Sequence, residues 1–520
     1  MRRYLPITLL AAALIVGGGG LWWARAGGTP DPASCLVVDR LPRIQPDYIN
    51  VMIPQNIAPL NFVVEEPGTR FYVTIAGEGG GRIDVQSRGP SFCFPIHTWR
   101  DLLSRNRGKD LQVTVFAKGK DGRWSSFQPI QNRVAEEPID PYVSYRLITP
   151  AYFWFHDDIE MGTYQRDVES FDEKVLLHNS SFRESACFNC HAFAANRPST
   201  MILHLRGDIG PAMLVNREGQ LTRVDTRANE KHGPVSMSSL HPNGRLMVFA
   251  SPDLGLFSKS AGEPREVFEF QSDVGIYRTD KNEFVRVSGL SSPDHAETFP
   301  AWSGDGKQLY FCRAEIQWLI IAGEKRRTLP GNYRDVRYDL MRIVYDETED
   351  TWGEPEMALS AEQLGKSISQ PAVSPDGRFI VFCAVDYGVW PLTRPEADLY
   401  LMDAATGNYK PMACNTPGSE SLPDWSDNGR WLVFSSKRKD GVFTRLYFTH
   451  VDENGRSSRA IELPQEDPAA HARFLRAYSI PQFMTGPVTI SERQLIGAIR
   501  EGLSAKGQGK EPGPDSRTDY

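Results

Sequence analysis

VSPDGRFIVF, at residues 373–382, is one of four similar ten-residue runs in this chain. Each run places Asn-Gly or Asp-Gly before an apolar strand, a pattern typical of a tight hairpin whose glycine has a positive φ. A hairpin signal that returns in this way predicts an all-β repeat fold. The other three runs are LHPNGRLMVF at 240–249, WSGDGKQLYF at 302–311 and WSDNGRWLVF at 425–434.

The spacing of the runs indicates the size of the repeated unit. Separations of this length suit one four-stranded blade per repeat with insertions, and therefore a β-propeller. We assign residues 201–497 to it. The hairpin glycines, which are separated by 62, 71 and 52 residues, are Gly244, Gly306, Gly377 and Gly429.

Two cysteines fall within the repeats. Cys312 and Cys383 occupy the same place after the strand phenylalanine, where Ala250 and Ser435 stand in the other runs. A position that accepts any small residue indicates a packing role. Both thiols are therefore expected to be buried in the core and to take no part in a reaction.

Some runs are followed by a second strand pair, for example DLYLMD at 398–403 before Thr406 and Gly407. From Ser236 to Leu463 these features resemble the TolB-like propeller repeats, which are related to the WD type. The resemblance implies a propeller of about six blades, with the missing ones built from residues 201–226 and from flanking segments.

A different pattern covers residues 35–147. Apolar and polar residues alternate at 71–75 and 111–117, and glycine-rich turns lie at 77–81 and 119–122. Period-two patterning with such turns predicts an antiparallel β-sandwich of immunoglobulin or fibronectin type. We expect this sandwich to be a binding or spacer module.

Cys187, Cys190 and His191 form a C-x-x-C-H sequence between these regions, in a segment that we assign to residues 148–200. Each thiol of such a motif can add across a vinyl group of haem while the imidazole ligates the iron. With seven Cys and ten His in the chain, chance produces the motif roughly 0.002 times per sequence of this composition. The motif predicts one covalent haem c with His191 as the proximal ligand.

Two other chemistries use a C-x-x-C pair. A structural zinc site needs a second Cys or His pair at ligand spacing, and the sequence has no other C-x-x-C. A thioredoxin-like redox pair needs a surrounding βαβ pattern, which the sequence does not show. Haem attachment is therefore the favoured interpretation.

The motif's spacing predicts a short helix, because residues three and four apart share a helical face. Ser181 and Glu184 fit a capping box, with Ser181 as N-cap. We expect a helix from about Phe182 to Phe193. The segment is short for a three-helix cytochrome fold, so the haem is expected to rest against a neighbouring domain. Candidate packing groups are Tyr152, Phe153, Trp154, Phe155, Phe182, Phe188 and Phe193.

The sequence does not decide which residue is the second axial ligand of the iron. Met201 is the first choice, because a thioether raises the reduction potential and suits electron transfer. His204 and His178 are the imidazole alternatives. A site without a second ligand would permit ligand binding or peroxide chemistry.

Residues 134–206 resemble an uncharacterised family of exported bacterial proteins that join a C-x-x-C-H segment to a TolB-like propeller. The resemblance implies an architecture rather than a reaction. The stretches that carry it are EEPIDPY at 136–142, YRLI at 145–148, GTYQR at 162–166, the motif at 187–191 and MILH at 201–204.

Residues 1–26 predict export. Arg2 and Arg3 precede a mostly apolar run over 4–23, and Ala-Arg-Ala at 24–26 has the form of a signal-peptidase site. The run is also long enough to remain as a membrane anchor, since about 20 apolar residues span a bilayer. Either outcome places the protein in the periplasm or on the outer face of the inner membrane.

In an oxidising compartment Cys35 and Cys93 either pair or remain as two buried thiols. The tail at 505–520, rich in Gly, Lys, Pro and Asp, is expected to be disordered. The net charge of −7 and the scattered Lys and Arg residues argue against a nucleic-acid partner.

Three functions compete. We favour a monohaem electron carrier whose propeller and sandwich dock a redox partner protein or a surface ligand. The second is a binding or scaffold propeller with a structural or sensory haem. The third is a haem-dependent propeller enzyme, but no G-x-S-x-G elbow occurs and no catalytic residue is assigned.

Overall fold

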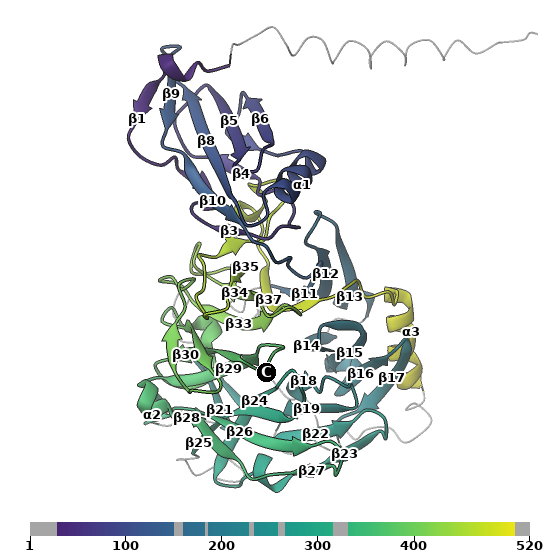
Figure 1. Ribbon diagram of the computed structural model, residues 1–520. Coiled ribbons are helices and arrows are strands. Elements are labelled where there is room, and N and C mark those ends of the chain that lie inside the picture. Colours follow the sequence, from purple (N-terminus) through teal and green to yellow (C-terminus); the bar gives the residue numbers. More distant parts are fainter. Residues whose placement is uncertain are drawn as a thin grey trace, which may run out of the picture.

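The computed structural model describes residues 29–149, 160–182, 186–227, 233–257, 266–315 and 331–504. Strands dominate, and the described residues form nine sheets (Figure 1). Among them no helix has the length and apolar character needed to cross a membrane. The predicted signal or anchor, the predicted tail, Glu184 and the four aromatic residues from Tyr152 to Phe155 lie outside the described residues.

The amino-terminal region contains two sheets and a helix, α1 (Ile96–Arg105), at one end of the molecule (Figure 1). The two runs with period-two patterning pair with each other antiparallel, so that Val73 lies opposite Val115. The larger sheet holds β1 (Leu36–Val38), β3 (Met52–Ile53), β5 (Arg70–Gly77), β6 (Arg82–Ser87), β8 (Asp110–Lys118), β9 (Trp124–Phe127) and β10 (Ile130–Val134); the smaller holds β2 (Ile44–Gln45), β4 (Phe62–Val64) and β7 (Ser91–Phe92).

The described residues from Tyr142 onward form a β-propeller. Six sheets surround a common centre, and their innermost strands β14, β18, β24, β29, β33 and β37 contact one another in that order and back to β14. The strand β37 comes from near the carboxyl terminus and pairs with β11, which directly follows the amino-terminal region. The first and the last strand of the propeller in sequence therefore pair and close the ring.

The sheets follow the chain in order around this ring. Their strands are β11 (Tyr142–Ile148), β12 (Met161–Asp167), β13 (Glu173–His178) and β37 (Ala477–Met484); β14 (Cys187–Ala194), β15 (Arg197–Arg206), β16 (Ala212–Arg217) and β17 (Gln220–Asp225); β18 (Ser236–Leu240), β19 (Leu246–Ala250), β22 (Val274–Arg278) and β23 (Glu283–Val285); β24 (His295–Trp302), β25 (Gln308–Glu315), β26 (Asp339–Asp346), β27 (Thr351–Trp352) and β28 (Glu356–Leu359); β29 (Ser367–Val373), β30 (Phe379–Val385), β31 (Asp398–Asp403) and β32 (Tyr409–Pro411); β33 (Glu420–Trp425), β34 (Trp431–Ser436), β35 (Arg445–His450) and β36 (Ile461–Glu462).

Three smaller elements complete the propeller. A hairpin of β20 (Asp253–Phe257) and β21 (Glu266–Gln271) contacts β24, and the short α2 (Ala361–Leu364) contacts β29. The longer α3 (Glu492–Ser504) lies against β13 and β17 (Figure 1). Its buried side chains Leu495 and Ile499 join the apolar cluster between the first two sheets.

The predicted hairpins are confirmed. The four glycines have φ between 66° and 71°, a region that only glycine enters at little cost. In the run at 373–382, Ser374 Oγ donates to Asp376 Oδ1 at 2.5 Å, and the same carboxylate accepts the Arg378 N–H at 3.0 Å. Cys312 and Cys383 are fully buried on β25 and β30, which confirms their packing role.

Each innermost strand contains a bulge. Its partner strand has one residue where the innermost strand has two, and in four sheets the second of the two is a proline. Proline cannot donate to a ladder, so a bulge is a place that accepts it. These prolines are Pro300, Pro371, Pro423 and Pro481.

The helix predicted over Phe182 to Phe193 is wrong. The motif lies instead on β14, the innermost strand of the second sheet, and Asn189 and Cys190 occupy its bulge. Ser181 does not cap a helix here, since its hydroxyl donates to Glu492 Oε1 of α3 at 3.1 Å. Pairing with β15 outweighs the local helix signals, because an innermost strand buries both faces between neighbouring sheets.

The segment at 148–200 is therefore built into the propeller rather than set apart. Its described strands β12 and β13 belong to the first sheet, and β14 and the start of β15 belong to the second. The motif consequently lies at the centre of the ring.

The two regions share one continuous apolar core. At their junction Tyr48 donates to the Glu462 carbonyl at 3.2 Å, and Arg459 pairs with Asp47 at 2.7 Å. The two amino-terminal cysteines are free and neither is buried. The Cys35 thiol donates to the Asp31 carbonyl and the Cys93 thiol to the Glu466 carbonyl, so the structure shows neither the disulfide nor the two buried thiols.

The Asp424 side chain of β33 binds the closing strand β37, and its ionisation is expected to make the stability of the protein depend on pH. Its Oδ2 accepts the Phe483 N–H of β37 at 2.8 Å, and burial, then the charge of Asp140, raises the pKa of Asp424 to about 7 from 3.8. The folded state therefore binds more protons than the unfolded state, and this group lowers the free energy of unfolding as pH rises from about 4 to about 7. Asp424→Asn keeps an acceptor oxygen and should remove on the order of 1–3 kcal/mol of that loss. Urea unfolding at both ends of this range measures it, and equal losses in variant and parent would contradict it.

Candidate haem site

The two thiols of the motif are free and lie at the start of β14. Cys187 is half-buried and directly opposite Arg206 of β15, so the two side chains share one face of the sheet. Cys190 is buried in the bulge, opposite His204. Burial raises the pKa of the Cys187 thiol more than the nearby Arg146 and Arg206 lower it, so this sulfur is a neutral thiol before any reaction.

His191 follows at the end of the bulge and is 3% exposed. Its ring lies 5.7 Å from that of Phe193, edge to face, and its Nε2 is buried without a hydrogen-bond partner among the described residues. Burial, then the charge of Arg146, lowers the pKa of His191 to about 3, so the ring is neutral. A neutral imidazole with an unused nitrogen is the form that ligates a metal.

The strand register separates these side chains. His191 lies opposite Leu203, whereas Cys187 lies opposite Arg206, three residues further along β15. Residues an odd number apart on a strand point to opposite faces. Cys187 therefore faces the third sheet and His191 faces the first, which contributes Leu177 to the same apolar cluster as Leu203. Within the described residues these donors do not converge as a bare metal-ion site.

The other predicted ligands have different surroundings. Met201 is buried in the apolar cluster and projects from the same face as His191. His204 projects from the other face, where its Nε2 lies 2.7 Å from Ser238 Oγ, while its Nδ1 is buried without a partner. His178 follows Leu177 of that cluster, so its ring points to the other face of β13, where Nδ1 lies 2.7 Å from Ser180 Oγ and Nε2 lies 3.7 Å from Glu160 Oε1.

One neighbour of the motif was not predicted. Met161, at the start of β12, is 6% exposed, and its Sδ accepts the Phe188 N–H of β14 at 3.4 Å. It lies 27 positions before Phe188 in the sequence, and the contact joins the first sheet to the second. No local pattern signals such a contact, because the pairing of sheets around the ring creates it.

The donor set fits covalent haem in kind. Two free thiols precede an imidazole whose Nε2 is buried and unpartnered, and such an atom costs free energy unless something binds it. The opposed faces of Cys187 and His191 require a local turn for all three to meet one porphyrin. The bulge at 189–190 is the place where β14 departs from its ladder.

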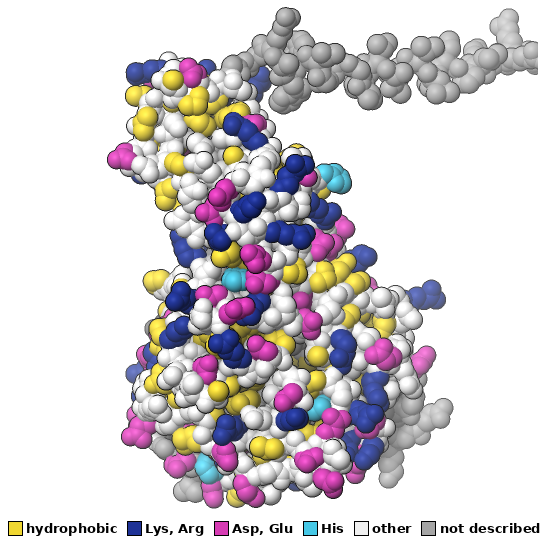
Figure 2. All heavy atoms as spheres, viewed as in Figure 1, with side chains coloured by type: hydrophobic (Ala, Val, Ile, Leu, Met, Phe, Trp, Pro, Cys, Tyr) yellow, Lys and Arg dark blue, Asp and Glu magenta, His cyan; other side chains and the backbone are white. Residues whose placement is uncertain are grey.

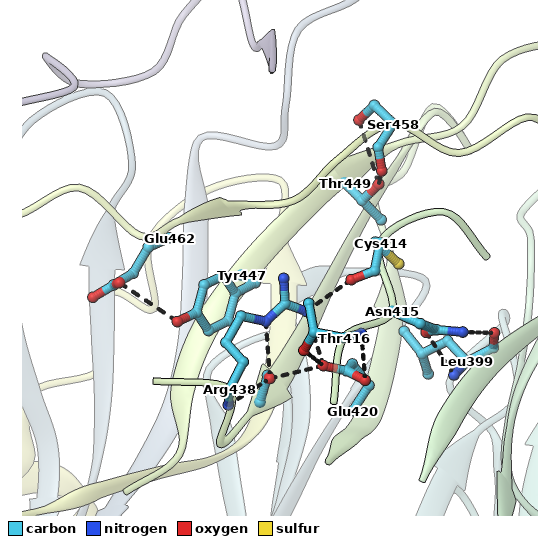
Figure 3. A network of polar contacts seen from close by, with 11 residues as sticks. Leu399, Cys414, Asn415, Thr416, Glu420, Arg438, Tyr447, Thr449, Ser458 and Glu462 are labelled. Atoms are coloured by element: carbon cyan, nitrogen blue, oxygen red, sulfur yellow. Dashed lines mark hydrogen bonds and ion pairs between the residues drawn. The ribbon is translucent and has the colours of Figure 1, made fainter. Parts of the chain in front are cut away.

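A second buried polar group, on β33, is satisfied internally (Figure 3). Glu420 Oε1 accepts hydrogen bonds from Thr416 at 2.8 Å and from Ser436 and Arg438 at 3.0 Å. Burial raises the pKa of Glu420 to about 7 even though Arg438 lowers it. The Arg438 guanidinium also lies over the Tyr447 ring at 4.3 Å. These contacts join β33 to the end of β34 and to the segments that precede β33 and follow β34.

Charges are interspersed over the surface. Figure 2 shows Lys and Arg side chains mixed with Asp and Glu on the visible face. Two expectations stay predictions: that the protein does not bind nucleic acid, and that it has a protein redox partner.

No family model and no curated protein matches the chain. Among solved structures, an oligogalacturonate lyase in complex with manganese is 13% identical over 61% of this chain and 72% of its own, with a TM-score of 0.35. The β-propeller domain of Cps50 (Swd1) from Myceliophteria thermophila is 14% identical over 60% and 85%, at 0.34. An oligogalacturonate lyase from Vibrio parahaemolyticus is 10% identical over 80% and 98%, at 0.32.

Proposed function

We propose that this chain is an exported c-type cytochrome with one haem, in which a TolB-like propeller of six blades holds the prosthetic group. The amino-terminal region is its sandwich of immunoglobulin or fibronectin type and acts as a spacer or docking module. The observation that carries the proposal is the unpartnered, buried Nε2 of His191, which follows two free thiols on the same strand.

In this proposal Cys187 and Cys190 form the thioether links and His191 ligates the iron through Nε2. When bound, the haem supplies a one-electron couple. The chain's own part is to hold the imidazole neutral, to exclude water around it and to place positive charge nearby. Arg146 supports this part, since its charge acts on His191 and on both cysteines. Positive charge close to a redox centre favours its reduced state.

The test is expression of the exported chain together with a haem c maturation system. We expect one haem per chain, a reversible one-electron redox titration and a reduced spectrum typical of haem c. The same chain without maturation genes is the control and should be colourless. A matured chain without bound haem would overturn the proposal.

One observation favours a second candidate, a haem that is structural or sensory. Cys190 and His191 are 7% and 3% exposed, and electron transfer to a protein partner needs a haem edge near the surface. Reduction rates with a small reductant and with a small soluble cytochrome distinguish the two functions. An electron carrier should accept electrons from both donors, whereas a structural haem should accept them only from the small reductant.

A further inference from the structure

Apolar side chains are exposed together at the end of the amino-terminal region that lies away from the propeller (Figure 1). Among the described residues seven large hydrophobic side chains are exposed, and three of them fall within six positions. These three are Leu36, Val37 and Leu41, with exposed fractions of 50%, 80% and 37%. Single exposed apolar residues are normal, whereas a cluster marks a surface that another body covers.

Strand β1 places two of these side chains at the rim of the larger sheet. It pairs only with β9 among the described strands, so its other edge is open. Val37 lies opposite Ser126 of β9, and Trp124, two residues before Ser126, projects from the same face. Lys118 of β8 lies opposite Trp124, with its Nζ 5.7 Å from the centre of the indole ring. The apolar rim therefore adjoins a tryptophan and a lysine.

This combination suits the interface of a lipid bilayer. A tryptophan ring has an apolar body and a polar N–H, and a lysine side chain can lie along apolar surface while its amine stays in water. Lys120, in the turn after β8, adds an exposed positive charge, and the nearby Asp121 is paired with Arg123 at 2.8 Å. Positive charge close to an anionic lipid surface strengthens binding to it.

The sequence indicates how this end of the molecule comes close to a bilayer. Twelve residues, 24–35, separate the apolar run at 4–23 from Leu36. A chain of this length spans at most roughly 40 Å. A run that stays in the bilayer as an anchor therefore keeps β1 within reach of the membrane surface.

We infer that this end of the amino-terminal region is a membrane-contact surface for anionic phospholipid. Leu36 and Val37 enter the boundary of the acyl chains, Trp124 lies at the level of the headgroups, and Lys118 contacts lipid phosphate. Figure 2 shows hydrophobic side chains next to Lys and Arg side chains at this end of the molecule. The propeller lies at the opposite end, so it stands away from the bilayer (Figure 1). Haem attachment plays no part in this contact.

The experiment measures co-sedimentation of residues 27–520, the product of the predicted cleavage, with lipid vesicles. This form keeps every described residue and lacks the apolar run. The vesicles contain phosphatidylcholine alone or with phosphatidylglycerol, and we expect stronger binding to the second kind. Leu36→Asp with Val37→Asp should lower the partition coefficient at least about tenfold, because both side chains lose their burial in the interface.

The matched control is Val344→Asp with Met357→Asp, since these side chains are 52% and 56% exposed on the propeller and the change in charge is the same. It should bind as the parent does, and Val37→Trp should bind more tightly. Circular dichroism checks the fold of each variant. Equal binding by the Leu36→Asp, Val37→Asp variant and its control, or no binding by the parent, would overturn the inference. A dimer of the parent without vesicles that this variant abolishes would overturn it too, because a second copy would then cover β1.

Discussion

A chain with both Cys187 and Cys190 replaced by alanine is expected to keep its fold and to lose all haem that survives denaturation. Each replacement removes one sulfur from β14 and leaves the ladder with β15 intact. Loss of a small buried group costs about 1 kcal/mol, which a propeller of this size tolerates. Without the sulfurs no thioether forms, so any remaining haem is held only through iron and leaves when the chain unfolds.

The measurement is haem absorbance after separation of the denatured chain, with circular dichroism of the native protein as the check on folding. Cys93→Ala is the matched control, because Cys93 is exposed and lies in the amino-terminal region. It should retain haem in full. Covalent haem in the double variant, or its loss in the control, would contradict the assignment of the tethering sulfurs.

Replacement of Arg438 by alanine should give the largest loss of stability among the substitutions considered. Arg438 is 15% exposed and Glu420 is fully buried, so above about pH 7, where Glu420 is ionised, the change leaves a carboxylate without its counter-ion (Figure 3). Breaking a buried pair from one side costs about 3–5 kcal/mol. The guanidinium also loses its contact with the Tyr447 ring.

Urea unfolding measures this loss. Arg123→Ala is the control, since Arg123 forms an ion pair with Asp121 at 2.8 Å that is 70% and 50% exposed. Exposed pairs contribute at most about 1 kcal/mol, so the control should differ little from the parent. A second check is the double variant Arg438→Met with Glu420→Gln, which should recover part of the loss because it leaves no buried charge. Equal losses for Arg438→Ala and the control would contradict this account of the network.

The hairpins could be predicted from the sequence because their determinants are local. An Asp or Asn side chain closes each turn onto the backbone two residues later, and glycine supplies the positive φ, as at Asp376 and Gly377. The same reasoning located Cys312 and Cys383 correctly, since equivalent places in a repeat share their packing. A repeated pattern allows this prediction because it shows which residues occupy equivalent positions.

The local signals failed where the ring closes. The capping box at Ser181 and the spacing of the motif favour a helix, but β15 and two flanking sheets bury both faces of this segment as a strand. The contact with Met161 depends on how the first sheet meets the second, which no window around the motif contains. The Cys and His donors of the site could therefore be predicted from the sequence. The residues that contact them could not, because those contacts depend on how the sheets pack around the ring.

The most direct test of the account is the mass of the matured chain after unfolding and extraction with acidified solvent. We predict a mass greater than that of the polypeptide by one haem, and a peptide containing Cys187 and Cys190 that carries the whole difference. A mass equal to that of the polypeptide alone would contradict the account.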